Sequence, residues 1–146
     1  MTDYHNAMAV GRNIEVSNKQ AREVLGFIKG MKVDTAIKRL ERVLIHDEAV
    51  PFKRFNSKVA HKKGIGPGRY PEKACDAIID ILKSAKNNAL NKGLQEEKLI
   101  ISEGVVGMAL SKRKRIRQRK ASYTGSMRLS NILIKLSEKE EDKKDD

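Results

Sequence analysis

The sequence predicts an α+β fold, in which a small sheet packs against three helices and a long β-hairpin extends from the sheet. Three segments place apolar residues at helical spacing, whereas Lys98–Leu110 and Ser130–Ser137 alternate as strands do. Gly104 and Gly107 predict bulges or local twist in the first of these strands. The basic run Lys112–Lys120 lies between the two strands, so a hairpin that carries the cations at its far end is the simplest connection.

The first two predicted elements are a weak strand and a helix. The strand covers Met8–Val16, and the helix follows because Ser17 and Gln20 have the spacing of a capping box. Apolar residues then recur at helical spacing up to Gly30, which is a natural stop. These apolar residues are Ala21, Val24, Leu25 and Ile28.

Two further helices follow along the chain. Asp34 is the predicted N-cap of a short helix that must end before Pro51. Its apolar face consists of Ile37, Leu40, Val43 and Leu44. Pro71 is well placed as the first residue of the third helix, and Gly93 closes that helix. The apolar stripe of the third helix is predicted to be core and consists of Ala74, Ile78, Ile81, Leu82, Ala85 and Ala89.

The length of 146 residues predicts one domain, over residues 1–137. We expect its globular part to comprise about residues 8–104 and 129–137, with a hairpin protruding over about 105–128. Residues 138–146 hold six acids and three lysines, so they are expected to form a disordered charged tail.

The charge distribution indicates a polyanionic partner. The net charge is +12, yet Met1–Ala49 is nearly balanced, with eight basic and seven acidic residues. Pro51–Tyr70 has six basic residues and no acid, and Gly104–Ser137 also has no acid. A near-neutral scaffold with two basic zones is typical of a nucleic-acid footprint, although an anionic membrane surface also fits the composition.

The run Lys112–Lys120 contains seven cations in nine positions. If the run is extended, Arg113, Arg115, Arg117 and Arg119 lie on one side, because side chains alternate along a strand. Arginine suits this role, since its guanidinium group binds phosphate in a bidentate manner and stacks on bases. The run also resembles a nuclear localisation signal, and both uses are compatible in a protein imported before assembly.

The other basic zone contains a glycine-rich segment, Gly64–Gly68. It matches neither the dinucleotide fingerprint nor a Walker loop, so a phosphate-backbone site fits better than a nucleotide pocket. An enzyme that binds a nucleotide at this loop is the weakest alternative. Phe52 and Phe55 are expected to anchor the zone to the core, with base stacking as the weaker alternative.

No pattern in the sequence predicts catalysis, a metal site or a cofactor. Cys75 is the only cysteine, which excludes an internal disulfide, and it is expected to be a small buried residue. The three histidines lack metal-ligand spacing, and Asp76 and Asp80 fit a solvated helix face. Aromatic residues make up 4% of the chain, which disfavours a stacking platform. We expect a soluble, intracellular protein that is not an enzyme.

Three segments together resemble a family of ribosomal proteins. They are Ala49–Asn56, Gly66–Pro71 and Lys83–Leu94. They are similar to large-subunit ribosomal protein twenty-two of the universal nomenclature, called seventeen in eukaryotes, in its archaeal and eukaryotic form. The resemblance covers about residues 10–137. It implies a compact α+β domain near the end of the peptide exit tunnel, and a hairpin that runs inward through ribosomal RNA to the tunnel wall.

The resemblance also implies which residues bind RNA and which form the tip of the hairpin in the exit tunnel. The implied RNA-binding residues are Lys53, Arg54, Lys58, Lys62, Lys63, Arg69, Lys112, Arg113, Lys114, Arg115, Arg117, Arg119, Lys120 and Arg128. The implied residues of the exit-tunnel tip are Arg117, Gln118, Arg119, Lys120, Ala121, Ser122 and Tyr123. The stretch from Ala121 to Ile132 is a few residues shorter than the usual family pattern.

The implied partners are large-subunit ribosomal RNA, neighbouring ribosomal proteins and the nascent polypeptide, with no membrane and no small-molecule substrate. The implied location is the cytoplasmic ribosome, with nuclear or nucleolar passage during assembly if the source is eukaryotic. A free-standing basic RNA-binding chaperone or regulator is the alternative function.

Overall fold

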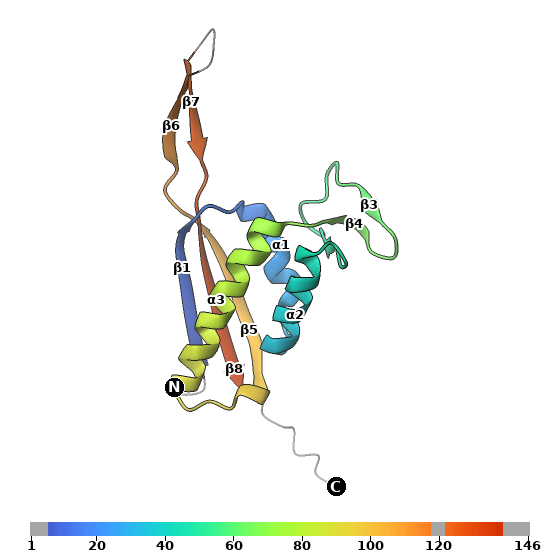
Figure 1. Ribbon diagram of the computed structural model, residues 1–146, viewed down its shortest axis with the longest axis vertical. Helices are drawn as coiled ribbons and strands as arrows, with labels where there is room; N and C mark the ends of the chain where they lie inside the picture. The colour runs from blue at the N-terminus through green and yellow to red at the C-terminus, as the bar shows by residue number, and fades with distance from the viewer. Residues whose placement is uncertain (1–5, 118–121, 139–146) are drawn as a thin grey trace.

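The computed structural model describes residues 6–117 and 122–138, and it has the predicted α+β class (Figure 1). Three helices pack on one face of a three-stranded antiparallel sheet. The helices are α1 (Asn18–Ile28), α2 (Val33–Leu44) and α3 (Glu72–Asn91). The strands, in their order across the sheet, are β1 (Asn6–Ile14), β8 (Ser130–Glu138) and β5 (Leu99–Met108). A short 3-10 turn, η1 (Glu96–Lys98), leads into β5.

The core lies between this sheet and the helices. Helix α3 packs on β1 and β8, α1 packs on β5, and α2 packs on α3. Every residue of the predicted apolar stripe of α3 is buried. Cys75 is also buried, which raises the pKa of its thiol to about 12. Within the described residues, no helix is long and apolar enough to cross a membrane.

The strand β5 differs from its prediction at Gly104. Its register against β8 shifts between Ile101 and Glu103, so the irregularity does not lie at the glycine. Gly104 instead allows α1 to approach closely, because a Cβ there would lie 3.1 Å from both δ-methyl groups of Leu25. Of the bulge or local twist predicted at Gly104, the bulge is therefore not found, and close packing explains that glycine.

The predicted helices are all present, with small differences at their starts. Ser17 is the N-cap of α1, but its side chain makes no capping hydrogen bond. Asp34 is not a cap: α2 begins at Val33 with Lys32 as N-cap, because Lys32 is extended and bridges to Ile100. Asp34 lies in the first turn, where the helix dipole favours an acid.

The third helix also begins one residue later than predicted. Pro71 is the N-cap of α3, and the first helical residue is Glu72. The carbonyl of Pro71 accepts hydrogen bonds from the backbone N–H groups of Ala74 and Cys75, each at 3.0 Å. Gly93 follows the helix with a φ of 78°, a left-handed conformation that stops a helix as predicted.

The predicted hairpin is present and projects beyond the sheet (Figure 1). Its lower part is the β5–β8 pair, and its upper part is the antiparallel pair β6 (Lys112–Arg117) and β7 (Ser122–Met127). The Ala109 N–H donates to the Leu129 carbonyl at 3.0 Å, which links the two parts. Residues 118–121, where the tip was expected, and residues 139–146 of the expected tail lie outside the described ranges.

The basic zone after α2 is more ordered than the predicted loop. It contains a small sheet of β2 (Val50–Pro51), β4 (Gly66–Arg69) and β3 (His61–Lys62), in that order. We call residues 50–70 the arm, because they extend sideways from the helices (Figure 1). Strands of two to four residues are too short to show apolar alternation, so the sequence did not reveal them.

A buried carboxylate on α1 holds the arm in place. Glu23 is 7% exposed, and its side chain accepts hydrogen bonds from three consecutive backbone N–H groups of the arm. The Lys53 N–H donates to Oε2 at 3.0 Å, while those of Arg54 and Phe55 donate to Oε1 at 2.8 Å and 2.7 Å. Phe52, next to them, is buried as predicted, and Phe55 packs partly buried against the core.

Replacing Glu23 by alanine should lower the free energy of unfolding by about 2–4 kcal/mol, because partly buried amides lose a charged acceptor. Urea denaturation measures this loss of stability. Hydrogen exchange should become faster at the backbone amides of residues 53–55. The matched control is Glu41→Ala, which removes an exposed glutamate of α2 and should change stability by less than about 0.5 kcal/mol. Equal stability of the two variants would show that the carboxylate does not hold the arm.

Candidate nucleic-acid interface

All six predicted cations of the arm are solvent-exposed. They are Lys53, Arg54, Lys58, Lys62, Lys63 and Arg69. Two of them lie over aromatic rings of the arm: the Lys62 Nζ is 5.1 Å from the centroid of Tyr70, and the Arg69 Cζ is 5.9 Å from that of Phe52. These contacts orient the aliphatic stems, while the charged groups remain accessible to an anion.

The hairpin carries the second group of predicted cations. Arg113 and Arg115 are exposed on β6, where they pair in register with Ser126 and Thr124 of β7. Because they are two residues apart in a strand, their side chains leave the same face, as the predicted alternation requires. Arg128 is exposed where the hairpin returns to the sheet.

The structure describes only some of the other predicted hairpin residues. Lys112, Lys114 and Arg117 belong to β6, and Ser122 and Tyr123 belong to β7. Four residues of the predicted tip and basic run lie outside the described ranges: Gln118, Arg119, Lys120 and Ala121.

Helix α1 connects the arm to the hairpin. The sequence alone did not indicate that this helix contributes to the interface. Lys19 and Arg22 are both exposed on α1. Two cavities of about 350 Å³ and 310 Å³ share Ser17 and Lys19 in their walls: the first faces the arm, and the second is bounded by Arg128 and the base of the hairpin. The near balance of charge over residues 1–49 concealed these two cations, since only the fold shows where they lie.

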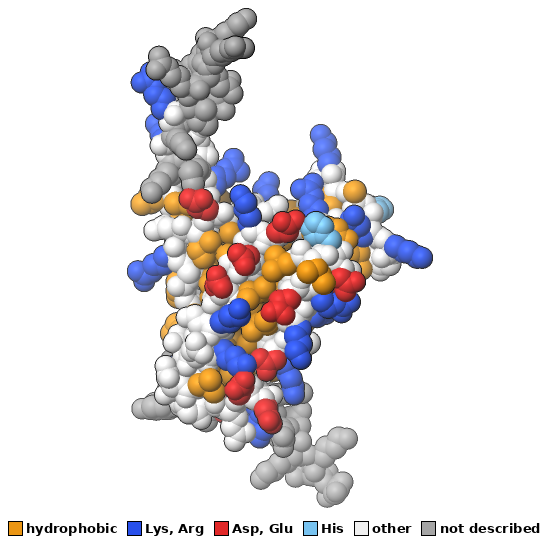
Figure 2. Space-filling view, in the orientation of Figure 1, with side chains coloured by type: hydrophobic (Ala, Val, Ile, Leu, Met, Phe, Trp, Pro, Cys, Tyr) orange, Lys and Arg blue, Asp and Glu red, His pale blue; other side chains and the backbone are white. Residues whose placement is uncertain are grey.

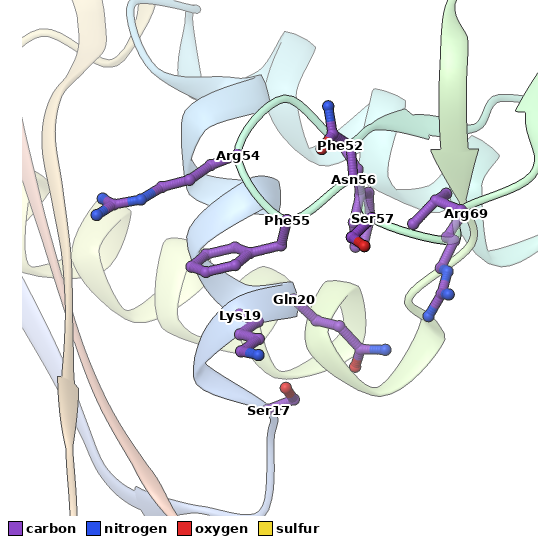
Figure 3. Close-up of a pocket in the computed structure, with 10 residues that line it drawn as sticks. Ser17, Lys19, Gln20, Phe52, Arg54, Phe55, Asn56, Ser57 and Arg69 are labelled. Atoms are coloured by element: carbon purple, nitrogen blue, oxygen red, sulfur yellow. The ribbon is translucent and has the colours of Figure 1, made fainter.

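The first cavity combines aromatic, amide and cationic side chains (Figure 3). Helix α1 supplies Ser17, Lys19 and Gln20, and the arm supplies the rest of the wall. The arm residues are Phe52, Arg54, Phe55, Asn56, Ser57, Val59 and Arg69. None of the lining residues is acidic, so the cavity is suited to an anionic ligand.

The base of the hairpin is more apolar than its upper part. Met108 is 88% exposed and Leu110 is 85% exposed, and Met108 lines the second cavity beside Arg128. The Ser130 hydroxyl, which is buried, donates to the Val16 carbonyl at 2.6 Å and also contacts the Asn18 side chain. These contacts hold the base of the hairpin against the start of α1.

Several acids of the helical face contact nearby cations. Lys86 binds Asp34 at 2.6 Å and Glu96 at 2.5 Å, and the hydrogen bond that its ammonium group donates to Asp34 is the main reason why the pKa of Lys86 is raised. Arg42 contacts Asp47 at 2.8 Å, and Glu48 pairs with Arg39. Figure 2 shows this mixture of red and blue side chains over the helices, whereas the arm displays mainly blue ones. The excess positive charge therefore lies away from the helical face.

Side chains that could hold a metal do not gather in the described residues. No group of three or more His, Cys, Asp or Glu side chains there is arranged to hold a metal. Asp76 and Asp80 are exposed on α3, as expected for a solvated face. The glycine-rich segment Gly64–Gly68 is followed by Arg69 and Tyr70 of the arm rather than directly by a helix, so it lacks the geometry of a dinucleotide fingerprint.

Comparison with known proteins agrees with the resemblance found in the sequence. Residues 9–137 match the family described as ribosomal protein L22p/L17e. Proteins named large ribosomal subunit protein uL22 are similar over 98 residues, with 53% identity in Methanocaldococcus jannaschii, 48% in Methanococcus vannielii and 42% in Methanothrix thermoacetophila. Each match covers 65% of this chain and 63–64% of the relative, so the chain spans less than two thirds of these relatives' length.

The family match covers most of the chain, including the three helices, the arm and the hairpin. The three helices and small antiparallel sheets, of the predicted α+β class, are consistent with this family. The chain therefore belongs to the ribosomal protein L22p/L17e family.

Proposed function

We propose that this chain is a structural, non-enzymatic component of the large ribosomal subunit that binds ribosomal RNA and supports translation and subunit assembly. Its family and the names of its relatives support a ribosomal role. The observation that carries the proposal is that two cavities, which meet at Ser17 and Lys19 and extend to the arm and to the base of the hairpin, are lined by cations and by no acid. Its location is the ribosome in the cytoplasm, and passage through a nucleus applies only if the source is eukaryotic.

The mechanism is charge neutralisation by the arm and the hairpin. The projecting β6–β7 pair is narrow enough to enter between RNA helices, where Arg113 and Arg115 reduce the repulsion between phosphate groups. The arm provides a second contact on the globular part, so that RNA segments on both sides are held together. Phosphate contacts fix position rather than sequence, so base-specific recognition is not required for this function.

We further propose that the hairpin extends through the RNA to line the nascent-peptide exit tunnel. The residues assigned to the tip are Arg117, Gln118, Arg119, Lys120, Ala121, Ser122 and Tyr123. The projection of β6 and β7 away from the sheet supports this assignment (Figure 1). Neighbouring ribosomal proteins and the nascent polypeptide are the proposed protein partners.

Removing two hairpin charges should weaken RNA binding in a salt-dependent way. For the double variant Arg113→Gln/Arg115→Gln, we expect the slope of log K against log salt to fall in magnitude by about 0.7–0.9 for each phosphate that is no longer neutralised. Filter binding to in vitro transcribed large-subunit ribosomal RNA from Methanocaldococcus jannaschii measures this slope. The double variant Lys38→Gln/Lys83→Gln, on exposed sites of α2 and α3, removes the same charge and should leave the slope unchanged. Equal slopes for both double variants would contradict a hairpin-specific contact.

Co-sedimentation separates the ribosomal role from a free-standing RNA-binding chaperone or regulator. We expect the tagged full chain, expressed in its own cells, to sediment in stoichiometric amount with the large subunit at moderate salt. High salt should release it, because its contacts with RNA are electrostatic. A protein found mainly in free ribonucleoprotein would refute the ribosomal role and support the alternative.

A further inference from the structure

We propose that the cavity between α1 and the arm binds one unpaired nucleotide of RNA, with its base stacked on Phe55. This inference rests on the proposed RNA-binding function and names a site within it. The cavity of about 350 Å³ lies at the small end of the range of about 300–1,000 Å³ that is usual for ligand pockets. That size suits a single nucleotide and excludes a duplex.

Two exposed cationic side chains lie over the aromatic ring at this cavity, and a stacked base can take the place of one of them. Phe55 is partly buried against the core, and the nearest cations, Lys19 and Arg54, lie 5.6 Å and 5.7 Å from its centroid. Both distances lie within the limit of about 6 Å for a cation–π contact, so both cations contact the ring. A stacked base can replace one of these exposed cations over Phe55, because a base stacked on an aromatic ring is held more strongly than an exposed cation–π contact. The ring of Phe27, by contrast, is covered by the Arg39 guanidinium at 4.5 Å, and Arg39 is held there by its ion pair with Glu48.

The rest of the wall matches the other parts of a nucleotide. Gln20 and Asn56 carry amide groups that can donate to and accept from the edge of a base (Figure 3). Lys19, Arg54 and Arg69 surround the site with positive charge for a phosphate, and no lining residue is acidic. An anionic phosphate joined to a planar base is the ligand that uses all three kinds of side chain.

Glu23 makes this site rigid before a ligand arrives. Its carboxylate holds the backbone N–H groups of Arg54 and Phe55, the two residues that supply a cation and the ring. Their backbone need not be ordered during binding, which reduces the entropic cost. The low aromatic content argues against an extended stacking platform, but a single ring suffices for one extruded base.

The test compares two RNA duplexes that differ only in one bulged adenosine. We expect the full chain to bind the bulged duplex more tightly than the perfect duplex, by about 5- to 150-fold, the range of one base stacked on an aromatic ring. Phe55→Leu should abolish this preference while the salt slope stays unchanged, because the cations remain. Phe27→Leu, a matched change at a covered ring, should keep the preference. Asn56→Ala, at an exposed position that is not needed for packing, should reduce it by about 2- to 12-fold.

Four other outcomes of this binding test would each contradict a different claim. Equal binding of the two duplexes by the wild-type chain overturns the nucleotide site but leaves the ribosomal role intact. Preference retained in Phe55→Leu overturns stacking on Phe55. Competition by free adenosine monophosphate at equal affinity shows that the cavity takes a free nucleotide rather than an RNA residue. Absence of binding to either duplex, and to ribosomal RNA, at low salt overturns the proposed function itself.

Discussion

The interaction of the Glu23 carboxylate with three consecutive backbone N–H groups determines how the basic arm is presented. When three neighbouring amides converge on one buried carboxylate, the backbone curves around it and the side chains of Lys53 and Arg54 are left exposed. A charged acceptor with three donors balances the cost of removing that charge from water. The position of the arm thus depends on α1 rather than on its own very short strands.

Helix α1 is itself fixed to the hairpin. Gly104 lets Leu25 pack directly on β5, and the Ser130 hydroxyl binds the Val16 carbonyl at the base of the hairpin. The arm, α1 and the hairpin therefore form one continuous surface. Asp47 and Glu48, in the loop after α2, pair with Arg42 and Arg39 of that helix, so these pairs add nothing to the net charge of +12.

The sequence predicts the parts of this fold that repeat a pattern over many residues. The stripe of α3 runs from Ala74 to Ala89, about four helical turns, and the two long strands alternate, so both are recognised from periodicity alone. The arm escapes prediction because two-residue strands such as His61–Lys62 have no period. Asp34 looks like a cap, yet the bridge from Lys32 to Ile100, a tertiary contact, moves the helix start.

The candidate site, like the fold, is predicted from the sequence only in part. The cations of the arm and hairpin are evident as acid-free segments, because each lies in one stretch of sequence. Lys19 and Gln20 become part of the site only when the fold brings α1 beside Phe55, which is 35 residues or more away in the chain. Glu23 looks like an ordinary helical glutamate in the sequence, since nothing local indicates that it faces the arm.

The central claim is that one face, from the arm through α1 to the hairpin, contacts ribosomal RNA. Protein–RNA crosslinking within assembled large subunits, read out residue by residue, tests it most directly. We expect crosslinks at Lys19, Arg54 and Arg69 as well as on the hairpin at Arg113 and Arg115. Crosslinks concentrated on the exposed helical face, with none on α1 or the arm, would contradict it.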